Sequence, residues 1–389
     1  MRPTVGQTEP FLYQKHRRFY AQVAGGLEEL AAAELKRLGA TRVKSEKRGV
    51  IFSADAEALC RINYRARLVS RVLAPLAEFP ARTPEELYLG AKQVDWTRLL
   101  RLDQTFAVFA NVHQSRVSHS KYAALKVKDC VVDMFRKRYG GKRPDVDAQE
   151  PDLWLAVHVL RDQATIFLDC SGGSLHRRGY RLEAVEAPMQ ETLAAAILDL
   201  AGWDGKRPLY DPMCGSGTLL AEAWLKAGNI PAGCLRGHWG FEMLPDHDKR
   251  TWFKVKLEED NAVRAVRGGL IRGSDLDPAA VEMTRRNLAR IPSGDELRVK
   301  TCDFRELDGL NDCLIVCNPP YGMRLQPAAD IKVFLGEFGD FLKRKCTGAD
   351  AWVYVGDNEL VGAIGLKPAL RKPLRNGGLD GRLLKFELY

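Results

Sequence analysis

The tetrapeptide Asn318-Pro319-Pro320-Tyr321 follows a short apolar run. Two consecutive prolines remove two backbone donors and hold the chain rigid, so nearby carbonyls and the Asn318 side chain can accept hydrogen bonds from a planar amino group. Tyr321 can stack on the base that carries this amine. We predict that these four residues form a catalytic motif that orients an exocyclic amine for direct group transfer. A plain Pro-Pro turn is the alternative.

A glycine-rich turn, DPMCGSGT, occupies residues 211–218 between an expected strand and an expected helix. Glycines at 215 and 217 allow a tight turn and bring a ligand close to the backbone at the start of the helix. The turn lacks the lysine of a P-loop, and its spacing differs from the dinucleotide GxGxxG. The amino-acid portion of a ligand would lie over it, with a carboxylate for the ammonium group. The predicted cofactor-binding residues here are Asp211, Pro212, Cys214, Gly215, Gly217 and Thr218.

Further ligand-type residues follow the next two expected strands. Asp275 stands where doubly wound folds bind ribose hydroxyls, and we expect Asp277 to cap the following helix. Asp303 could accept a hydrogen bond from an adenine amino group, and Phe304 could cover it with an apolar ring. Each of these alone is as easily a turn or core residue. These two loops, the glycine-rich turn and the loop that begins at Asn318 follow successive strands, so we expect them to meet at one sheet edge. We also expect Asn318 to touch the cofactor.

Helices and strands alternate from about residue 187 to residue 389, which predicts a parallel sheet covered by helices. The first helix is expected over 187–200 and a further one over 331–345. Residues 229–260 have a mixed character and look like an insertion. We predict an α/β, Rossmann-type domain that positions the motifs described above.

Residues 18–172 mix strands, helices and hairpins in an order typical of an α+β module. A helix is expected over 119–138, and two antiparallel strands over 154–172. Residues 1–17 look like a polar, poorly ordered extension.

The 389-residue chain carries a net charge of +9, which favours polyanionic partners. Lysine and arginine gather in residues 116–143, with interleaved tyrosine and phenylalanine. We predict that Lys121, Lys126 and Lys128 contact RNA phosphates. A solvated helix face is the alternative.

The sequence has no apolar run long enough to span a membrane, and its start lacks the pattern of a secretory signal. We therefore expect a cytoplasmic protein without a membrane partner. Its nine cysteines form no CxxC pair, so we expect reduced, mostly buried thiols and no metal site.

In chain order, the motifs DPMCGSGT (211–218), GSDLDP (273–278), CDF (302–304) and NPPYG (318–322) resemble those of class I S-adenosylmethionine-dependent methyltransferases that act on amino groups. Segments such as GLEELAAAELKRLGA, SKYAALKVKDCVVDMF and LDCSGGSLHRRGYR resemble the THUMP-domain RNA methyltransferases, from about residue 18 onward. Larger members carry a second methyltransferase half, for which this sequence has no counterpart. The resemblance implies S-adenosylmethionine as cofactor and the N2 amine of a guanosine in large-subunit (23S) rRNA as substrate. A tRNA guanosine, or a non-catalytic role in assembly, stays an alternative.

The same resemblance implies a domain plan. It places a ferredoxin-like segment at 18–75, a THUMP RNA-binding domain at 76–172, a linker at 173–186 and the methyltransferase domain at 187–389.

The resemblance also implies roles for two short segments. Gln190, Glu191 and Thr192 would close over the cofactor, although helix capping explains them equally well. The linker arginines would reach phosphates or a flipped nucleotide, with structural ion pairs as the alternative. These arginines are Arg177, Arg178 and Arg181.

Overall fold

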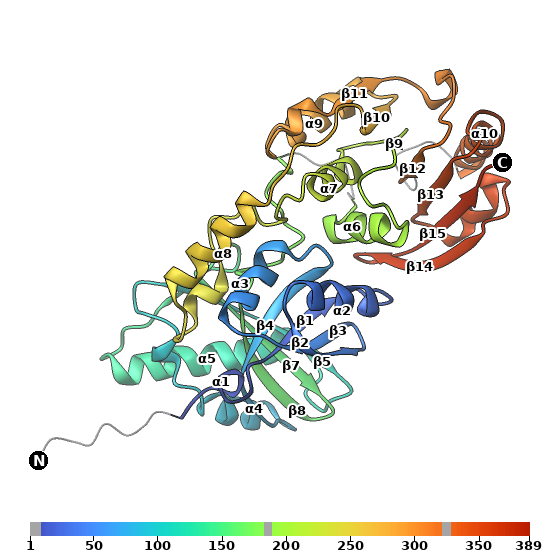
Figure 1. The fold of residues 1–389 in the computed structure, drawn as a ribbon. Helices are drawn as coiled ribbons and strands as arrows, with labels where there is room; N and C mark the ends of the chain where they lie inside the picture. Colours follow the sequence, from blue (N-terminus) through green and yellow to red (C-terminus); the bar gives the residue numbers. More distant parts are fainter. Residues whose placement is uncertain (1–8, 183–188, 321–327) are drawn as a thin grey trace, which may run out of the picture.

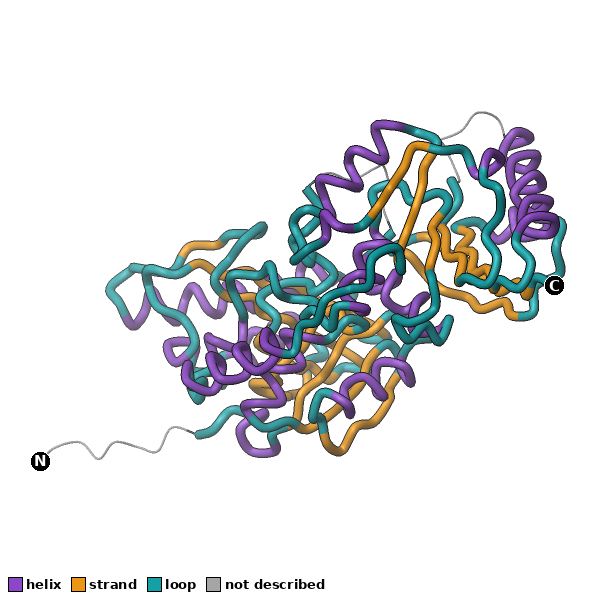
Figure 2. Tube along the Cα trace, turned by 45° about the horizontal axis from the view of Figure 1, so that its top comes forward, coloured by secondary structure: helices purple, strands orange, loops and turns teal. Residues whose placement is uncertain are grey.

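The computed structural model describes residues 9–182, 189–320 and 328–389. The chain forms two lobes, each built on one β-sheet with helices packed against it (Figures 1 and 2). The N-terminal lobe holds the residues up to the linker, and the C-terminal lobe holds most of the residues from 189 onward. No helix among the described residues is long and apolar enough to cross a membrane.

The C-terminal lobe has a seven-stranded sheet, parallel except where β15 pairs with its two neighbours. Its strands lie in the order β11 (Arg298–Thr301), β10 (Ile271–Asp275), β9 (Leu209–Asp211), β12 (Leu314–Cys317), β13 (Asp350–Val355), β15 (Leu379–Glu387) and β14 (Leu370–Asn376). The order reverses between β9 and β12, and ligands of doubly wound folds bind at such a switch point. The predicted Rossmann-type class is confirmed.

Helices cover both faces of this sheet, because the crossovers between parallel strands place them there. They are α6 (Glu191–Leu200), α7 (Thr218–Ala227), α9 (Pro278–Leu288) and α10 (Ala328–Lys345). The four residues of β12 are all buried, which is what a central strand covered on both faces requires. Asn318 follows immediately at the carboxyl end of this strand.

The N-terminal lobe has a single eight-stranded sheet, mostly antiparallel. Its strands lie in the order β2 (Thr41–Glu46), β3 (Gly49–Ser53), β1 (Arg18–Val23), β4 (Val69–Pro80), β8 (Gln163–Asp169), β7 (Leu153–Leu160), β5 (Thr105–His113) and β6 (Asp145–Val146). The helices that pack on it are α2 (Glu28–Arg37), α3 (Ala56–Arg65), α4 (Pro84–Ala91) and α5 (Ser120–Arg138). Strand β4 runs through the predicted boundary at residues 75 and 76, so the two expected N-terminal modules share one sheet.

The expectation of a poorly ordered extension over residues 1–17 is wrong for its second half. Residues 12–16 form the helix α1 (Leu12–His16), and only 2% of Tyr13 is exposed. The Tyr13 hydroxyl donates a hydrogen bond to Asp246, which lies more than two hundred residues further along the chain. A packing partner this far away in the chain cannot be predicted from the residues around Tyr13. Residues 1–8 lie outside the described residues.

The predicted insertion connects the two lobes. It contains the 3₁₀ helix η2 (Gly240–Met243) and the helix α8 (Lys249–Asn261), and Figure 1 shows α8 alongside α3. Glu259 of α8 forms ion pairs with Arg61 and Arg65 of α3, each at 2.7 Å. Although this segment belongs to the C-terminal half of the sequence, it packs on the N-terminal lobe.

Candidate active site

A cavity of about 310 Å³ opens at the carboxyl ends of β9, β10, β11 and β12. The loops that carry the predicted motifs all contribute to it, as expected for successive strands of a parallel sheet. The lining residues are Met189, Asp211, Pro212, Met213, Cys214, Gly215, Ser216, Thr218, Leu219, Asp275, Leu276, Asp277, Ala280, Asp303, Phe304, Asn318, Pro320 and Phe334. Sequence reasoning missed several of these apolar residues, since nothing in the local pattern distinguishes them from core residues.

The two glycines of the turn have different roles. Gly215 has a φ of +56°, and a Cβ built there meets no atom within 4 Å, so this residue leaves space beside the cavity. Gly217 has a φ of +79°, and a Cβ there would lie 2.7 Å from the Thr284 Cγ2 of α9. Gly217 does not line the cavity. It therefore serves close packing of α7 on α9, whereas Gly215 is the residue that a ligand could approach.

Asp211 ends β9 and is only 1% exposed. Its Oδ1 accepts a hydrogen bond from the Met213 backbone at 3.1 Å. Burial raises the pKa of this carboxyl well above its usual range, and the nearby charge of Asp275 raises it further. A cationic group in the cavity would lower this pKa again and hold the carboxylate ionised.

Asp275 ends β10 and holds the glycine turn in place. Its Oδ2 accepts a hydrogen bond from the Gly215 backbone at 2.8 Å, and its Oδ1 accepts one from Asp277 at 3.0 Å. Burial raises the pKa of the Asp275 carboxyl. Asp277 caps α9 by accepting a hydrogen bond from the Ala279 backbone at 2.9 Å, which confirms its predicted role.

Asp303 and Phe304 follow β11. Both carboxylate oxygens of Asp303 interact with Arg305, one with its backbone at 2.9 Å and the other with its guanidinium at 2.7 Å. The Phe304 ring packs edge-on against Phe334 of α10, with ring centroids 5.4 Å apart. The two rings form an apolar wall, of which the sequence predicted only Phe304.

Asn318 lines the cavity with its side chain. Its Oδ1 is buried, and no described residue donates a hydrogen bond to it. A buried carbonyl left unsatisfied costs about 1–3 kcal/mol, so such an atom at a cavity wall indicates a ligand donor. Pro320 lines the cavity too, and Pro319 is buried next to it. Tyr321 lies outside the described residues.

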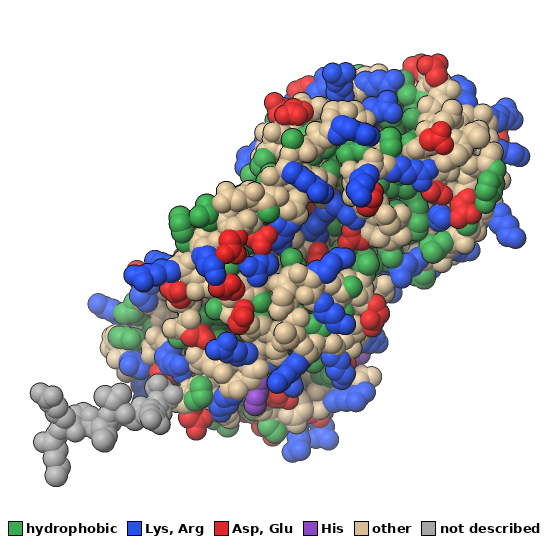
Figure 3. Space-filling view, in the orientation of Figure 1, with side chains coloured by type: hydrophobic (Ala, Val, Ile, Leu, Met, Phe, Trp, Pro, Cys, Tyr) green, Lys and Arg blue, Asp and Glu red, His purple; other side chains and the backbone are tan. Residues whose placement is uncertain are grey.

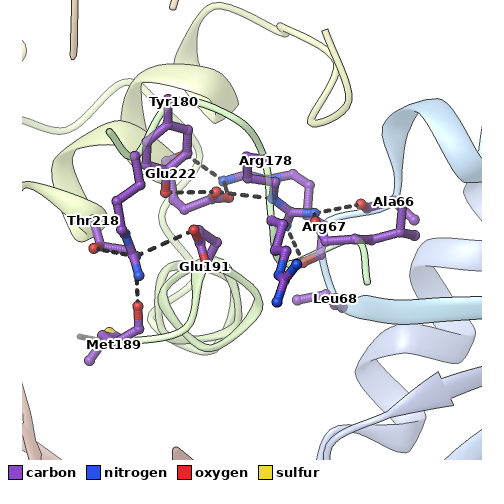
Figure 4. A network of polar contacts seen from close by, with 12 residues as sticks. Ala66, Arg67, Leu68, Arg178, Tyr180, Met189, Glu191, Thr218 and Glu222 are labelled. Carbon is purple, nitrogen blue, oxygen red and sulfur yellow. Dashed lines mark hydrogen bonds and ion pairs between the residues drawn. The ribbon is translucent and has the colours of Figure 1, made fainter. Parts of the chain in front are cut away.

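Arg178 is only 2% exposed, and the prediction that it contacts RNA is wrong. Its Nε donates to Glu222 Oε1 at 3.2 Å, and its Nη2 donates to the Arg67 backbone carbonyl at 2.6 Å. Its Nη1 donates to two further backbone carbonyls. Figure 4 shows this guanidinium between Glu222 of α7 and the Ala66–Leu68 segment of the N-terminal lobe. Arg178 is therefore a fully partnered cation that joins the lobes.

Arg181 points toward the start of α6 and α7, and its predicted contact with RNA stays a prediction. Its Nη2 donates to the Met189 carbonyl at 2.8 Å and to Thr218 Oγ1 at 2.9 Å, and it pairs with Glu191 at 3.4 Å. Met189 and Thr218 line the cavity, so Arg181 supports its wall from behind.

The residues expected to close over the cofactor lie at the start of α6. Glu191 and Thr192 are buried, and neither belongs to the cavity lining among the described residues. Burial raises the pKa of the Glu191 carboxyl, while the nearby Arg181 lowers it. Their predicted contact with the cofactor stays a prediction. Met189, just before them, is the residue of this segment that reaches the cavity.

The remaining predicted RNA contacts lie on the surface. Lys121 is exposed, the Lys126 ammonium lies 5.3 Å from the centre of the Tyr122 ring, and Lys128 pairs with Asp129 at 2.5 Å. All lie on α5, in the lobe that does not hold the cavity (Figure 1). Arg177 is exposed in the linker. Their contact with RNA stays a prediction.

Three segments of the chain match known protein families. Residues 178–385 match the family described as the RMKL-like methyltransferase domain. The chain belongs to this family. Residues 81–169 match the THUMP domain, and residues 18–73 match the RlmL ferredoxin-like domain. The predicted family resemblance is confirmed.

Two curated relatives illustrate how far the similarity extends. The chain is 41% identical to the ribosomal RNA large subunit methyltransferase K/L of Syntrophotalea carbinolica, over 95% of this chain and 53% of that protein. It is 38% identical to a Synechocystis sp. protein named as an RNA methyltransferase, over 96% of this chain and 97% of that protein. The chain thus spans about half the length of the K/L relative and nearly all of the Synechocystis protein.

Solved structures share the whole arrangement. The crystal structure of SMU.472, described as a methyltransferase and complexed with SAH, covers 96% of this chain and 98% of its own, with a TM-score of 0.82 and 29% identity. A Listeria monocytogenes protein described as a predicted N6-adenine-specific DNA methylase covers 96% of each chain, with a TM-score of 0.81 and 29% identity. The chain is an S-adenosylmethionine-dependent methyltransferase, as predicted.

Proposed function

We propose that this enzyme methylates RNA, and that its product is N2-methylguanosine in large-subunit rRNA. The observation that carries the choice of an amine is the buried Asn318 Oδ1 at the cavity wall, to which no residue in the described part of the chain donates a hydrogen bond. The choice of RNA rests on the THUMP match, and the choice of large-subunit rRNA rests on the name of the K/L relatives.

The cavity suits the cofactor in its charges and its shape. Asp211 would hold the ammonium group, and the backbone at Gly215 and the start of α7 would hold the carboxylate. Asp275 would accept hydrogen bonds from the ribose hydroxyls. The Phe304 and Phe334 rings would enclose the adenine, beside Asp303. When bound, the cofactor supplies an electrophilic methyl group on a sulfonium centre.

Asn318 would orient the substrate amine. Its Oδ1 and the Pro319 carbonyl accept the two amino hydrogens, which turns the nitrogen lone pair toward the cofactor. Pro320 keeps this segment rigid because its ring fixes φ. No strong base is required among these residues, since the amine becomes acidic once alkylated and releases its proton to solvent. The stacking role of Tyr321 belongs to the same proposal.

The charge of the protein suits a polyanionic substrate. Lysine and arginine side chains are scattered over both lobes in the view of Figure 3, with acidic side chains among them. We place the phosphate contacts on the exposed Lys121 and Arg177 and on the half-buried Lys126 and Lys128. A paired guanine would have to leave its stack to reach the cavity. Cytoplasm is the compartment that such a substrate implies.

Methyl transfer from labelled S-adenosylmethionine to protein-free 23S rRNA and to bulk tRNA, followed by nucleoside analysis, tests the proposal. N2-methylguanosine in the rRNA is the expected product. Label only in tRNA would replace the substrate, and N6-methyladenosine would replace the amine. If neither RNA is labelled, a 50S particle is assayed next, and the absence of label there would favour the non-catalytic alternative.

A further inference from the structure

In the described residues, the eight-stranded sheet of the N-terminal lobe has one face packed under helices and another whose apolar cluster holds strand residues alone. Alternate residues of its strands, such as Phe19, Val72 and Leu155, belong to the large core that includes residues of α2, α3, α4 and α5. The other face forms a separate small cluster. Its members come from strands alone, and they are Tyr20, Leu73, Phe109, Ala156 and Phe167. Within the described part of the chain, this cluster contains no helical residue.

Aromatic side chains are concentrated on this second face. The rings of Tyr20, His158 and Phe167 contact one another, with centroids 5.7 Å apart for Tyr20 and His158 and 4.9 Å for His158 and Phe167. The rings of Phe109 and Trp154 lie 6.1 Å apart. We call these five residues the aromatic sheet face. Most of its rings are half-buried, so their edges and faces remain accessible to a partner.

Arg71 extends this surface. Its guanidinium lies 4.4 Å from the centre of the Phe109 ring and 5.3 Å from that of Trp154. It also forms an ion pair with Asp169, whose side chain is buried. In this ion pair the planar Arg71 guanidinium lies over the Phe109 and Trp154 rings, and the Asp169 carboxylate balances its positive charge.

A basic groove of about 240 Å³ continues this face at one edge of the sheet. Its lining includes His16, Arg18, Arg42 and Lys44. Arg18 lies on β1, two residues before Tyr20, and cross-strand pairing puts Ile51 of the groove beside Tyr20. Residues paired across neighbouring strands share a face, so the groove and the aromatic sheet face form one continuous surface.

We propose that the aromatic sheet face binds unpaired bases of the RNA substrate, with the phosphate backbone running into the basic groove. Accessible aromatic rings beside cationic side chains are the combination by which proteins hold single-stranded nucleic acid. The groove cations argue against an apolar protein partner, which would desolvate them without supplying anions. This inference rests on the proposed RNA substrate but not on guanine-N2 specificity.

The test measures binding of the full-length chain to a fluorescent, mixed-sequence RNA of about 12 nucleotides, both single-stranded and annealed to its complement. The variant Tyr20→Leu/Phe109→Leu keeps apolar bulk but removes two stacking surfaces. We expect it to bind the single strand at least about tenfold more weakly and the duplex with unchanged affinity. Phe253→Leu is the matched control, because Phe253 is an aromatic residue of α8 that is 70% exposed and lies off this face.

Unchanged affinity for the single strand would overturn the proposal, and so would an equal loss for the duplex. If the double variant unfolds at a lower temperature, photo-crosslinking of the unaltered protein to RNA containing 4-thiouridine decides instead. Crosslinks on peptides with Tyr20, Phe109 or Trp154 support the aromatic sheet face, and crosslinks confined to other peptides refute it. Binding is measured without methyl transfer, so a different methylated product would leave this result intact.

Discussion

Asn318 Oδ1 and the Arg178 guanidinium are both buried polar groups, but their surroundings differ. The Arg178 guanidinium has a carboxylate and three backbone carbonyls as partners, whereas Asn318 Oδ1 has no donor among the described residues. Buried polar groups without partners are rare in native proteins because desolvation is costly. A complete set of partners therefore marks a structural role, and an absent partner at a cavity marks a ligand site.

Asn318→Ala is expected to have the largest effect. Removing the acceptor for the substrate amine should lower methyl transfer by about a hundredfold to a thousandfold, as for other single groups that position reacting atoms. The dissociation constant for S-adenosylmethionine, measured by calorimetry, should change little. A matching loss of cofactor binding would show that Asn318 holds the cofactor and would refute its assignment to the amine.

Arg178→Met is expected to destabilise the fold rather than the chemistry. Removal of the cation leaves the fully buried carboxylate of Glu222 with fewer partners, which costs about 3 kcal/mol in the free energy of unfolding. Urea denaturation measures this loss. The double variant Arg178→Met/Glu222→Gln should recover part of it, and a lack of recovery would mean that the ion pair is not the source.

His158 is a titratable side chain whose surroundings can be tested by changing the pH. Burial lowers its pKa to about 4, and the side chains of Gln22 and Asn111 contact its ring nitrogen. Between pH 6.5 and 4 the unfolded chain therefore binds a proton that the folded chain does not, and stability falls as the pH falls. The His158 share amounts to about 2 kcal/mol between pH 7 and pH 4.5.

His158→Gln should remove this share, so its unfolding free energy should depend less steeply on pH than that of the unaltered protein. Denaturant titrations at several pH values measure the difference. Parallel pH profiles for the two proteins would mean that the His158 ring is accessible to protons in the folded state.

Substitutions of the two glycines of the turn should also differ in whether they mainly affect stability or cofactor binding, with smaller effects than those above. Gly217→Ala should cost about 1–3 kcal/mol of stability, because its Cβ would strike Thr284 and the backbone has a positive φ. Gly215→Ala has space for its Cβ but shares the positive φ, so it should cost about 1 kcal/mol of stability, less than Gly217→Ala. Its larger effect should be on cofactor binding, because Gly215 lines the cavity. Equal effects of both substitutions on unfolding would contradict the distinction between a packing glycine and a ligand-facing one.

Features that depend on neighbouring residues could be predicted from the sequence. The glycine turn, the helix cap at Asp277 and the loop at Asn318 each follow from a strand and the few residues after it. The parallel order of these strands brings their ends together, so the positions of Asp211, Asp275 and Asn318 around one cavity could be predicted.

The other features of the protein depend on tertiary contacts. Partners far away in the chain fix the position of Tyr13 and turn Arg178 and Arg181 inward. Distant partners also let residues 229–260 join the two lobes. A linker arginine has the same local sequence whether it faces solvent or a buried glutamate. Burial and the partners of a charge are properties of the packed chain, so no local pattern could distinguish these two outcomes.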